Sequence, residues 1–318
     1  MCYLYRRRMD YFIALNQILI LFILIGIGYF ARRIKLLNDA SVSSLSKFLL
    51  HICIPAMVIF SMQIPFTNEV LMKGEYLILA AFAYYGIAFL VAWFSPILMR
   101  AKKEEYGVFR FMIMFSNSMF MGFPILSMLY GQDAIFYAAL FNIPFTILTY
   151  SVGIWILRAQ EKDNGKISFN PKLLLNPAFL STIVGLIFFL TSFSIPDPLY
   201  SSLELLNNVT TPLSLVVTGG FLAQLNFTSI FKNVRQYIVA AIRLLGMPAL
   251  VYLIFSQFID DTLILGIIVV TAGMPAAVNT VLLAEEHKAH PDIAAQGICI
   301  STLLCLVTLP LLAVFLTG

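Results

Sequence analysis

Long runs of apolar residues alternate with short polar connections along most of the chain. Each run has about the ~20 residues that an α-helix needs to cross the hydrocarbon core of a bilayer. The pattern therefore predicts ten membrane-spanning helices. They cover residues 11–31, 42–62, 76–99, 107–130, 133–157, 177–194, 199–224, 237–258, 262–284 and 294–317.

Composition agrees with this pattern. Of the 318 residues, 60% are hydrophobic and only 11% are charged, whereas soluble domains carry about 25% charged residues. The chain is predicted to be an all-α polytopic membrane protein, and its net charge of +4 reports topology rather than nucleic-acid binding. The four cysteines, Cys2, Cys53, Cys299 and Cys305, have no metal-ligand spacing. With no catalytic triad or phosphate-binding loop in the sequence, we expect no enzyme and no cofactor.

Two of the predicted helices contain residues that are unusual in a lipid-facing helix. The fourth includes "SNSMFMGFP", with Ser116, Asn117, Ser118, Gly122 and Pro124, and the ninth includes "AGMPAAVNT", with Gly273, Pro275, Asn279 and Thr280. Backbone groups freed inside a membrane are tolerated where they line a cavity or are buried in protein. The sequence therefore predicts that both helices are broken at their prolines and that the polar residues beside the breaks bind a substrate.

Several short matches between the two halves of the chain indicate a duplication. Pro55 and Pro212 are 157 positions apart, and Pro124 and Pro275 are 151 apart. Gly86 and Gly246 follow the same order at an offset of 160. Five helices per half is an odd number, so the second half would insert upside down. We predict a first repeat over 1–158, a cytoplasmic linker over 159–176 and an inverted second repeat over 177–318.

The segments that carry these features resemble the auxin efflux carrier family. The resemblance lies in "NSMFMGFPI", "AGMPAAVNTVLLAEEH", "IPAMVIF" and "TPLSLVV", and it covers essentially the whole chain. It implies two inverted five-helix repeats, a panel and a transport domain, and crossed broken helices at the substrate site. It also implies a fold similar to bile-acid symporters and sodium–proton antiporters, and, by analogy, a homodimer formed through the panel domain. The family includes plant auxin exporters and bacterial carriers assigned to malonate or malate.

One departure from the plant carriers bears on the substrate. Those carriers have a long central loop and an Asn-Pro-Asn element at the crossing, whereas this chain has a short loop and lacks that triplet. This difference argues against auxin as the substrate.

The distribution of Lys and Arg predicts the orientation. Loops after odd-numbered helices hold thirteen basic residues, and loops after even-numbered helices hold only Lys73. The thirteen are Arg32, Arg33, Lys35, Arg100, Lys102, Lys103, Arg158, Lys162, Lys166, Lys172, Lys232, Arg235 and Lys288. Positive residues favour the cytoplasmic side, so both termini are expected outside the cell membrane. The Arg6–Arg8 cluster conflicts with this bias, and Met9 directly after it is the start that we expect.

This orientation can be tested in the 159–176 connection. A cysteine that replaces Asn164 is expected to react with a membrane-impermeant maleimide only after the cells are permeabilised. The unmodified chain measures the background from its native cysteines. Labelling of the variant in intact cells would overturn the orientation.

The helix breaks also indicate the charge of the substrate. Each half-helix after a break presents free N–H groups at mid-membrane, and two such positive ends favour an anion. The opposite C-terminal ends would suit a cation, and the sequence leaves open which pair is used. No acidic residue lies deep in a predicted span, which favours transport without proton or sodium coupling, although sodium held by carbonyl groups stays possible.

The substrate-site candidates are Asn117, Ser118, Gly122, Pro124, Gly273, Pro275, Asn279, Thr280, Asn142 and His51. His51 is interpreted first as a structural histidine with a proton carrier as the alternative, and Asn142 as a cavity or packing residue. Arg243, near a span end, is interpreted as reaching the membrane interface.

The function that fits these features is secondary transport of small organic anions, such as malonate or malate, by elevator-like alternating access. The alternatives are a non-transporting receptor or sensor, a channel, and a sodium-coupled symporter of another organic solute. The expected partners are the anion, the bilayer and a second copy of the chain.

Overall fold

The computed structural model describes residues 2–158, 176–223 and 233–317, and it describes no side chains for residues 2–15, 17, 18 and 317. These residues form helices and no β-strand, so the predicted all-helical class is confirmed. The test position Asn164 and most of the 159–176 linker lie outside the described residues.

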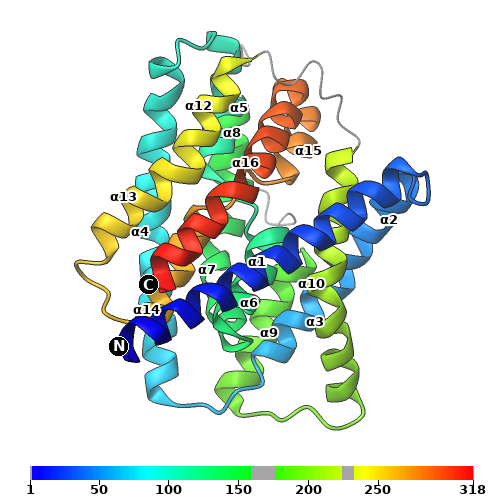
Figure 1. Cartoon of the computed structure of the whole chain (residues 1–318), viewed down its shortest axis with the longest axis vertical. Helices are drawn as coiled ribbons and strands as arrows, with labels where there is room; N and C mark the ends of the chain where they lie inside the picture. The colour runs from blue at the N-terminus through cyan, green and yellow to red at the C-terminus, as the bar shows by residue number, and fades with distance from the viewer. Residues whose placement is uncertain (1, 159–175, 224–232, 318) are drawn as a thin grey trace.

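Within each described range the helices follow one another with short connections (Figure 1). The first half contains α1 (Cys2–Arg33), α2 (Asp39–Phe48), η1 (Leu49–Cys53), α3 (Ile54–Ser61), α4 (Asn68–Leu98), η2 (Lys103–Glu105), α5 (Tyr106–Met114), η3 (Ser118–Gly122), α6 (Phe123–Tyr130), α7 (Asp133–Leu148), η4 (Thr149–Gly153) and α8 (Ile154–Arg158). The second half contains α9 (Pro177–Thr191), α10 (Leu199–Ala223), α12 (Val234–Ala241), η6 (Ile242–Gly246), α13 (Met247–Phe255), α14 (Thr262–Ala272), α15 (Asn279–Glu286) and α16 (Pro291–Thr317).

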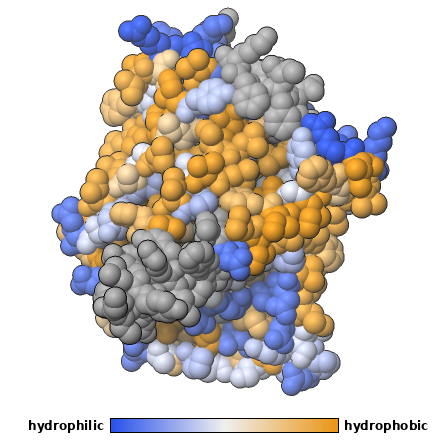
Figure 2. Space-filling model, viewed as in Figure 1, coloured by the Kyte–Doolittle hydropathy of each residue, from blue (hydrophilic) through white to orange (hydrophobic). Residues whose placement is uncertain are grey.

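Six continuous helices in the described part are long and apolar enough to cross a membrane. They are Asp39–Ser61, Asn68–Leu98, Asp133–Arg158, Leu199–Ala223, Val234–Phe255 and Pro291–Leu316. Shorter apolar helices cover Ser118–Tyr130, Pro177–Thr191 and Thr262–Ala272. Figure 2 shows that apolar residues dominate the visible face, with hydrophilic residues at its upper and lower edges and at the α2 end. The chain is therefore a multi-pass membrane protein.

Polar side chains set where several helices begin. The side chains of Asn38, Thr67 and Asn176 accept hydrogen bonds from backbone N–H groups three residues later, at 2.8, 3.2 and 2.8 Å. Each bond satisfies one of the N–H groups that the first turn of a helix leaves free. These N-terminal caps fix the residue at which each apolar helix begins.

Several prolines lie inside helical runs that continue through them, and three of these prolines share a local feature. Pro55, Pro124 and Pro248 each follow a π-helical turn, namely η1, η3 and η6, that ends two residues before the proline. A proline ring clashes with the carbonyl four residues back and supplies no N–H. The wider π turn relieves this conflict, because its hydrogen bonds span five residues instead of four. A proline in these apolar runs thus does not by itself end a helix.

A small ionic cluster joins α4 to the start of α14. The Lys73 ammonium lies 2.9 Å from Glu69 and 3.1 Å from Asp261. Burial acts to raise the pKa of Asp261, but hydrogen bonds from the Ile264 N–H and from Lys73 outweigh it, and the net shift is downward. Lys73 is the single basic residue in the loops predicted to face outside, and these two partners compensate its charge.

Candidate functional site

Two helical runs are interrupted in the interior of the molecule. The first leaves the helix after Met114 and resumes at Ser118, and the second leaves it after Ala272 and resumes at Asn279. The residues at both interruptions are buried from Phe115 to Ser118 and from Gly273 to Ala277. Each run is therefore divided into two short helices, α5 and η3–α6 in one case and α14 and α15 in the other.

The two interruptions bind each other through their backbones. The Asn117 N–H donates to the Pro275 carbonyl at 2.8 Å, and the Ala277 N–H donates to the Phe115 carbonyl at 3.1 Å. These bonds form one isolated antiparallel bridge between Ser116 and Ala276. Unpaired backbone groups inside a membrane cost several kcal/mol each. The bridge removes part of that cost, so each interruption is stabilised by the other.

The position of the first interruption corrects a prediction from the sequence. We expected the fourth helix to break at Pro124, but Pro124 lies in the first turn of α6, directly after the π turn η3. The break is at Phe115–Asn117, where the chain pairs with the second interruption. In the second interruption the prediction is closer, because Pro275 lies within the non-helical segment.

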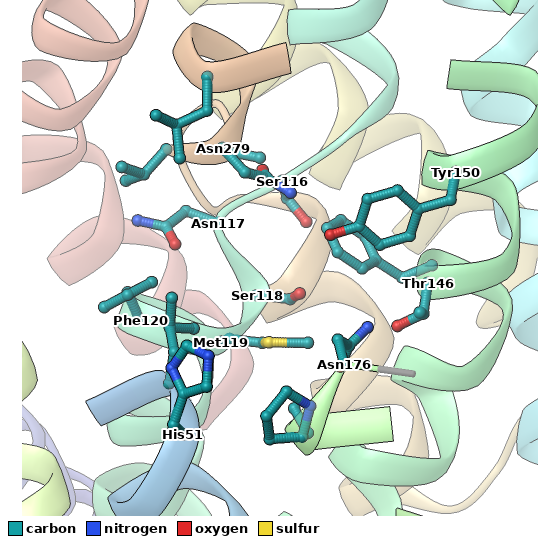
Figure 3. Close-up of a pocket in the computed structure, with 17 residues that line it drawn as sticks. His51, Ser116, Asn117, Ser118, Met119, Phe120, Thr146, Tyr150, Asn176 and Asn279 are labelled. Carbon is teal, nitrogen blue, oxygen red and sulfur yellow. The ribbon is translucent and has the colours of Figure 1, made fainter. Parts of the chain in front are cut away.

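A cavity of about 300 Å³ lies against the joined interruptions (Figure 3). Its wall is formed by Leu50, His51, Ser116, Asn117, Ser118, Met119, Phe120, Phe145, Thr146, Tyr150, Asn176, Pro177, Ala178, Ala277, Val278, Asn279 and Leu282. The residue before η3, Asn117, and the first residue of α15, Asn279, both belong to this wall. The positive N-terminal ends of two short helices therefore meet at one cavity.

Two polar groups at the interruption are buried without a hydrogen-bond partner among the described residues. They are the side-chain amide nitrogen of Asn117 and the hydroxyl of Ser116. Asn117 is only 4% exposed, and its side chain makes no capping bond to η3. A buried donor without a partner costs about 1–3 kcal/mol. This cost is offset if a molecule in the cavity accepts a hydrogen bond from the Asn117 amide.

Polar side chains on α7 and η4 lie next to the first interruption. The Ser118 hydroxyl donates to the side-chain oxygen of Asn142 at 2.8 Å. One and two turns further along the same face are Thr146 and Tyr150, which line the cavity. Figure 3 shows the Tyr150 hydroxyl pointing toward the interruption. Asn142 thus supports the wall, whereas Thr146 and Tyr150 form part of it.

The structure brings together four of the predicted site residues, Asn117, Ser118, Asn279 and His51, on the cavity wall. The other predicted residues, Gly122, Pro124, Asn142, Gly273, Pro275 and Thr280, are not among the described residues that line it. Gly273 serves packing, because a Cβ there would lie 2.6 Å from Leu312. The buried Thr280 hydroxyl donates to the Ala277 carbonyl at 2.6 Å. His51 bonds the Lys47 carbonyl through Nδ1 at 2.8 Å, as a structural histidine would.

A second cavity of about 410 Å³ adjoins the first. The two share Leu50, Phe120, Val278, Asn279 and Leu282. The second cavity adds Lys47, one turn before His51 on the same helical run, together with hydroxyl groups from Ser43, Ser46, Thr218 and Thr302. Asn279 therefore borders both cavities. The basic side chain of Lys47 lines only the second cavity.

The sequence interpretation missed Thr146, Tyr150 and Asn176 on the first cavity and Lys47 on the second, and it left Ser116, which it had placed beside the break, out of the candidates. For Thr146 and Tyr150 a signal was present, because Asn142, Thr146 and Tyr150 recur every four residues and so share one helix face. Lys47 and Asn176 carried no such signal, since their approach to the cavity depends on how separate helices pack.

The interpretation of Arg243 as an interfacial residue is wrong. Its side chain is fully buried, and the guanidinium donates hydrogen bonds to the carbonyls of Ile113, at the end of α5, and Met274, in the second interruption. An arginine side chain reaches the interface only if its helix leaves it a path along the surface, and here η6 directs it toward the protein interior.

The fold with its two joined interruptions is that of a multi-pass membrane protein. Residues 13–313 match the model of a family described as "Membrane transport protein". The chain therefore belongs to this family, which is that of the auxin efflux carriers.

Similar proteins agree with this assignment. An uncharacterized transporter of Methanocaldococcus jannaschii is 22% identical over 94% of this chain and 97% of its own length. A Rhizobium meliloti protein named "Putative malonate transporter" is 24% identical over 90% of both chains. Auxin efflux carrier component 8 of Arabidopsis thaliana is 18% identical over 94% of this chain and 96% of its own.

Proposed function

We propose that this protein transports small organic anions, mono- or dicarboxylates such as malonate or malate, and binds them in the cavity at the joined interruptions. The observation that carries the proposal is the side-chain amide of Asn117, a buried donor without a partner at the N-terminal end of a short helix. A carboxylate oxygen satisfies such a donor and is favoured by the positive helix ends.

The chemistry of the cavity wall supports an anion. The wall residues include hydroxyl and amide groups, with no Asp or Glu among the described ones. Lys47 in the adjoining cavity adds positive charge next to the site. Since a carboxylate in the wall would repel an anion strongly at low dielectric, the composition favours anions over cationic solutes.

The size of the cavity supports a small solute. A volume of about 300 Å³ is at the lower end of the ~300–1,000 Å³ typical of small-molecule sites. Malonate and malate have few heavy atoms and two carboxylates, one for each helix end. The similarity to the Rhizobium meliloti protein points to the same substrate class.

The mechanism that we propose is elevator-like alternating access in a ten-helix fold made of two inverted repeats. Its support is the pairing of the interruptions: the bridge partners Ser116 and Ala276 are 160 positions apart, the same offset as Gly86 and Gly246. The first repeat would cover 1–158 and the second 177–318, with both termini outside. Inverted repeats with interrupted helices at a shared site are typical of secondary transporters. A homodimer through exposed apolar faces is part of the proposal.

Counterflow in proteoliposomes tests this function. Purified protein is expected to exchange radiolabelled malonate or malate for the unlabelled anion, and the exchange is expected to be competed by other small carboxylates. Malonamide, which has nearly the same shape but no charge, is expected not to compete. Liposomes without protein provide the background.

The outcomes separate the proposal from its alternatives. Competition by malonamide at the concentration at which malonate competes would show that charge is not recognised. Binding of a carboxylate without any exchange would support a receptor or sensor instead. Exchange that requires a sodium gradient would support the sodium-coupled symporter.

A further inference from the structure

The guanidinium of Arg243 lies where the C-terminal ends of two helices converge. Ile113 is in the last turn of α5 and Thr271 is in the last turn of α14, and the carbonyls of both accept hydrogen bonds from Arg243, at 2.9 and 3.4 Å. Nε donates to the carbonyl of Met274, inside the second interruption, at 3.1 Å. The side chain thus binds both interrupted runs on their negative ends.

The hydroxyl of Tyr84 on α4 completes the surroundings of this guanidinium. It accepts one bond from each terminal nitrogen of Arg243, both at 3.2 Å. With the three carbonyls, these contacts use all five N–H donors of a guanidinium. Arg243 and Tyr84 are both fully buried. The arginine is therefore fully hydrogen-bonded, in contrast to the unpartnered amide of Asn117.

Arg243 has no acidic partner in the described part of the molecule. The buried charged side chains there are Arg110 and Arg243, and no buried Asp or Glu accompanies them. Burial of an uncompensated charge costs several kcal/mol. Each helix C-terminus carries roughly half a negative charge, so two of them together balance about one positive charge. The two helix ends, instead of a carboxylate, therefore neutralise Arg243.

The oxygens around Arg243 are also the kind of ligand that an alkali cation takes. Rings of backbone carbonyls replace the hydration shell of potassium in channels, and helix C-terminal ends coordinate sodium in transporters with interrupted helices. Here three carbonyls and one hydroxyl converge in the same manner, but a side chain of the protein occupies the space between them.

We infer that Arg243 is a built-in cation: its guanidinium occupies a monovalent-cation position behind the two interruptions, holds them in register, and makes substrate movement independent of alkali cations. Arg243 is thus a positioning residue, and it does not line the cavity. The transport part of this inference deepens the proposed function and rests on it. The occupied cation position does not depend on which solute is carried.

The test removes the guanidinium and asks whether a free cation takes its place. Arg243→Ala leaves the three carbonyls and the Tyr84 hydroxyl facing an empty space. Its thermal unfolding is measured without substrate in choline, sodium, potassium and low-millimolar guanidinium chloride at constant ionic strength. We expect saturable stabilisation of this variant by guanidinium or an alkali cation, by about 2–4 °C near saturation. The parent protein is expected not to respond.

Arg110 provides the matched control. It is also a buried arginine, 7% exposed, on α5, but its guanidinium lies 3.8 Å from the Trp93 ring centroid and donates to the Trp93 carbonyl instead of to a carbonyl at the interruptions. Arg110→Ala is expected to lose stability without any rescue by guanidinium. Equal responses of the two variants, or no response of Arg243→Ala, would reduce Arg243 to a packing residue and overturn the inference.

Counterflow with the same proteins gives the second measurement. Exchange by the parent is expected to be equal in sodium, potassium and choline. Arg243→Ala is expected to lose about tenfold or more of its rate, because several hydrogen bonds to a charged group are lost, and to regain part of it with guanidinium. Sodium dependence of the parent would place the cation elsewhere and overturn the inference.

A second variant covers the case in which Arg243→Ala does not fold, and the unfolding measurement covers the case in which the proposed function fails. If Arg243→Ala does not fold, Arg243→Lys keeps the charge with fewer donors and is expected to be destabilised without gaining a response to alkali cations. A response of Arg243→Lys to sodium would contradict the inference. If no carboxylate is exchanged by the parent, the proposed function fails, while guanidinium rescue of unfolding still decides the role of Arg243.

Discussion

Replacing Gly219 with alanine is expected to destabilise the protein by about 3 kcal/mol, a large part of the ~5–15 kcal/mol that holds a typical protein folded. A Cβ at this position would lie 1.9 Å from the Ile25 carbonyl oxygen and 2.8 Å from the Tyr29 backbone nitrogen. At the facing position, a Cβ on Gly28 would lie 1.9 Å from the Val216 carbonyl oxygen. The backbones of α1 and α10 are thus in direct contact, and neither can give way as a flexible side chain would.

Gly86→Ala is the matched control for this substitution. Gly86 lies within α4, and a Cβ there would have no atom within 4 Å. The change is expected to be neutral or stabilising, because alanine favours a helix by up to ~1 kcal/mol over glycine. The measurement is thermal unfolding of both purified variants in one detergent. Equal midpoints for the two would contradict the close contact of α1 with α10, which cross in Figure 1.

Replacing Asn117 with aspartate is expected to abolish transport of organic anions while the protein stays folded. Asp and Asn have nearly the same shape, and both are favoured before the first turn of a helix. The carboxylate would nevertheless lie in a buried site next to the anion, where like charges repel strongly. It would also accept hydrogen bonds where the amide donates. We expect a loss of affinity of about a hundredfold or more.

Asn117→Ala is the companion variant, since it removes the amide without adding charge. The affinity of this variant for the anion is expected to fall by about tenfold to a hundredfold, equivalent to ~1–3 kcal/mol. Affinity is measured by competition in counterflow, and folding by the unfolding midpoint. If Asn117→Asp transports carboxylates like the parent, the amide does not contact the anion. If it instead transports a cationic solute better, the charge of the proposed substrate is wrong.

His51 provides a further comparison on the same cavity. Its Nδ1 is bonded to the Lys47 carbonyl within the same helical run, which fits the structural role expected from the sequence. The bond links side chain to backbone four residues earlier, so it is formed whether or not a substrate is present. A larger loss of affinity in His51→Ala than in Asn117→Ala would move the substrate site toward α2.

Six of the ten predicted spans coincide with long apolar helices, because bilayer thickness imposes a length and an apolar composition that can be counted along the chain. The two interrupted runs, marked by "SNS" and "AGMPAAVNT", could also be predicted from the sequence, because polar residues deep in an apolar run are tolerated only where they line a cavity or are buried in protein. The prolines were a poorer guide. Pro124 is accommodated by a π turn, whose hydrogen bonds depend on the surrounding backbone and not on the presence of a proline alone.

What the sequence determined by itself is local: an all-helical membrane protein, and two interrupted runs marked by Asn117 and Asn279. What only the tertiary structure decided is how segments about 160 positions apart meet. The bridge between Ser116 and Ala276 placed the first interruption, and the convergence of two helix ends placed Arg243 in the interior rather than at the interface. The physical reason is that apolar length and periodicity act within one helix, whereas the cost of a buried charge or an unpaired backbone group depends on which neighbour comes close enough to compensate it.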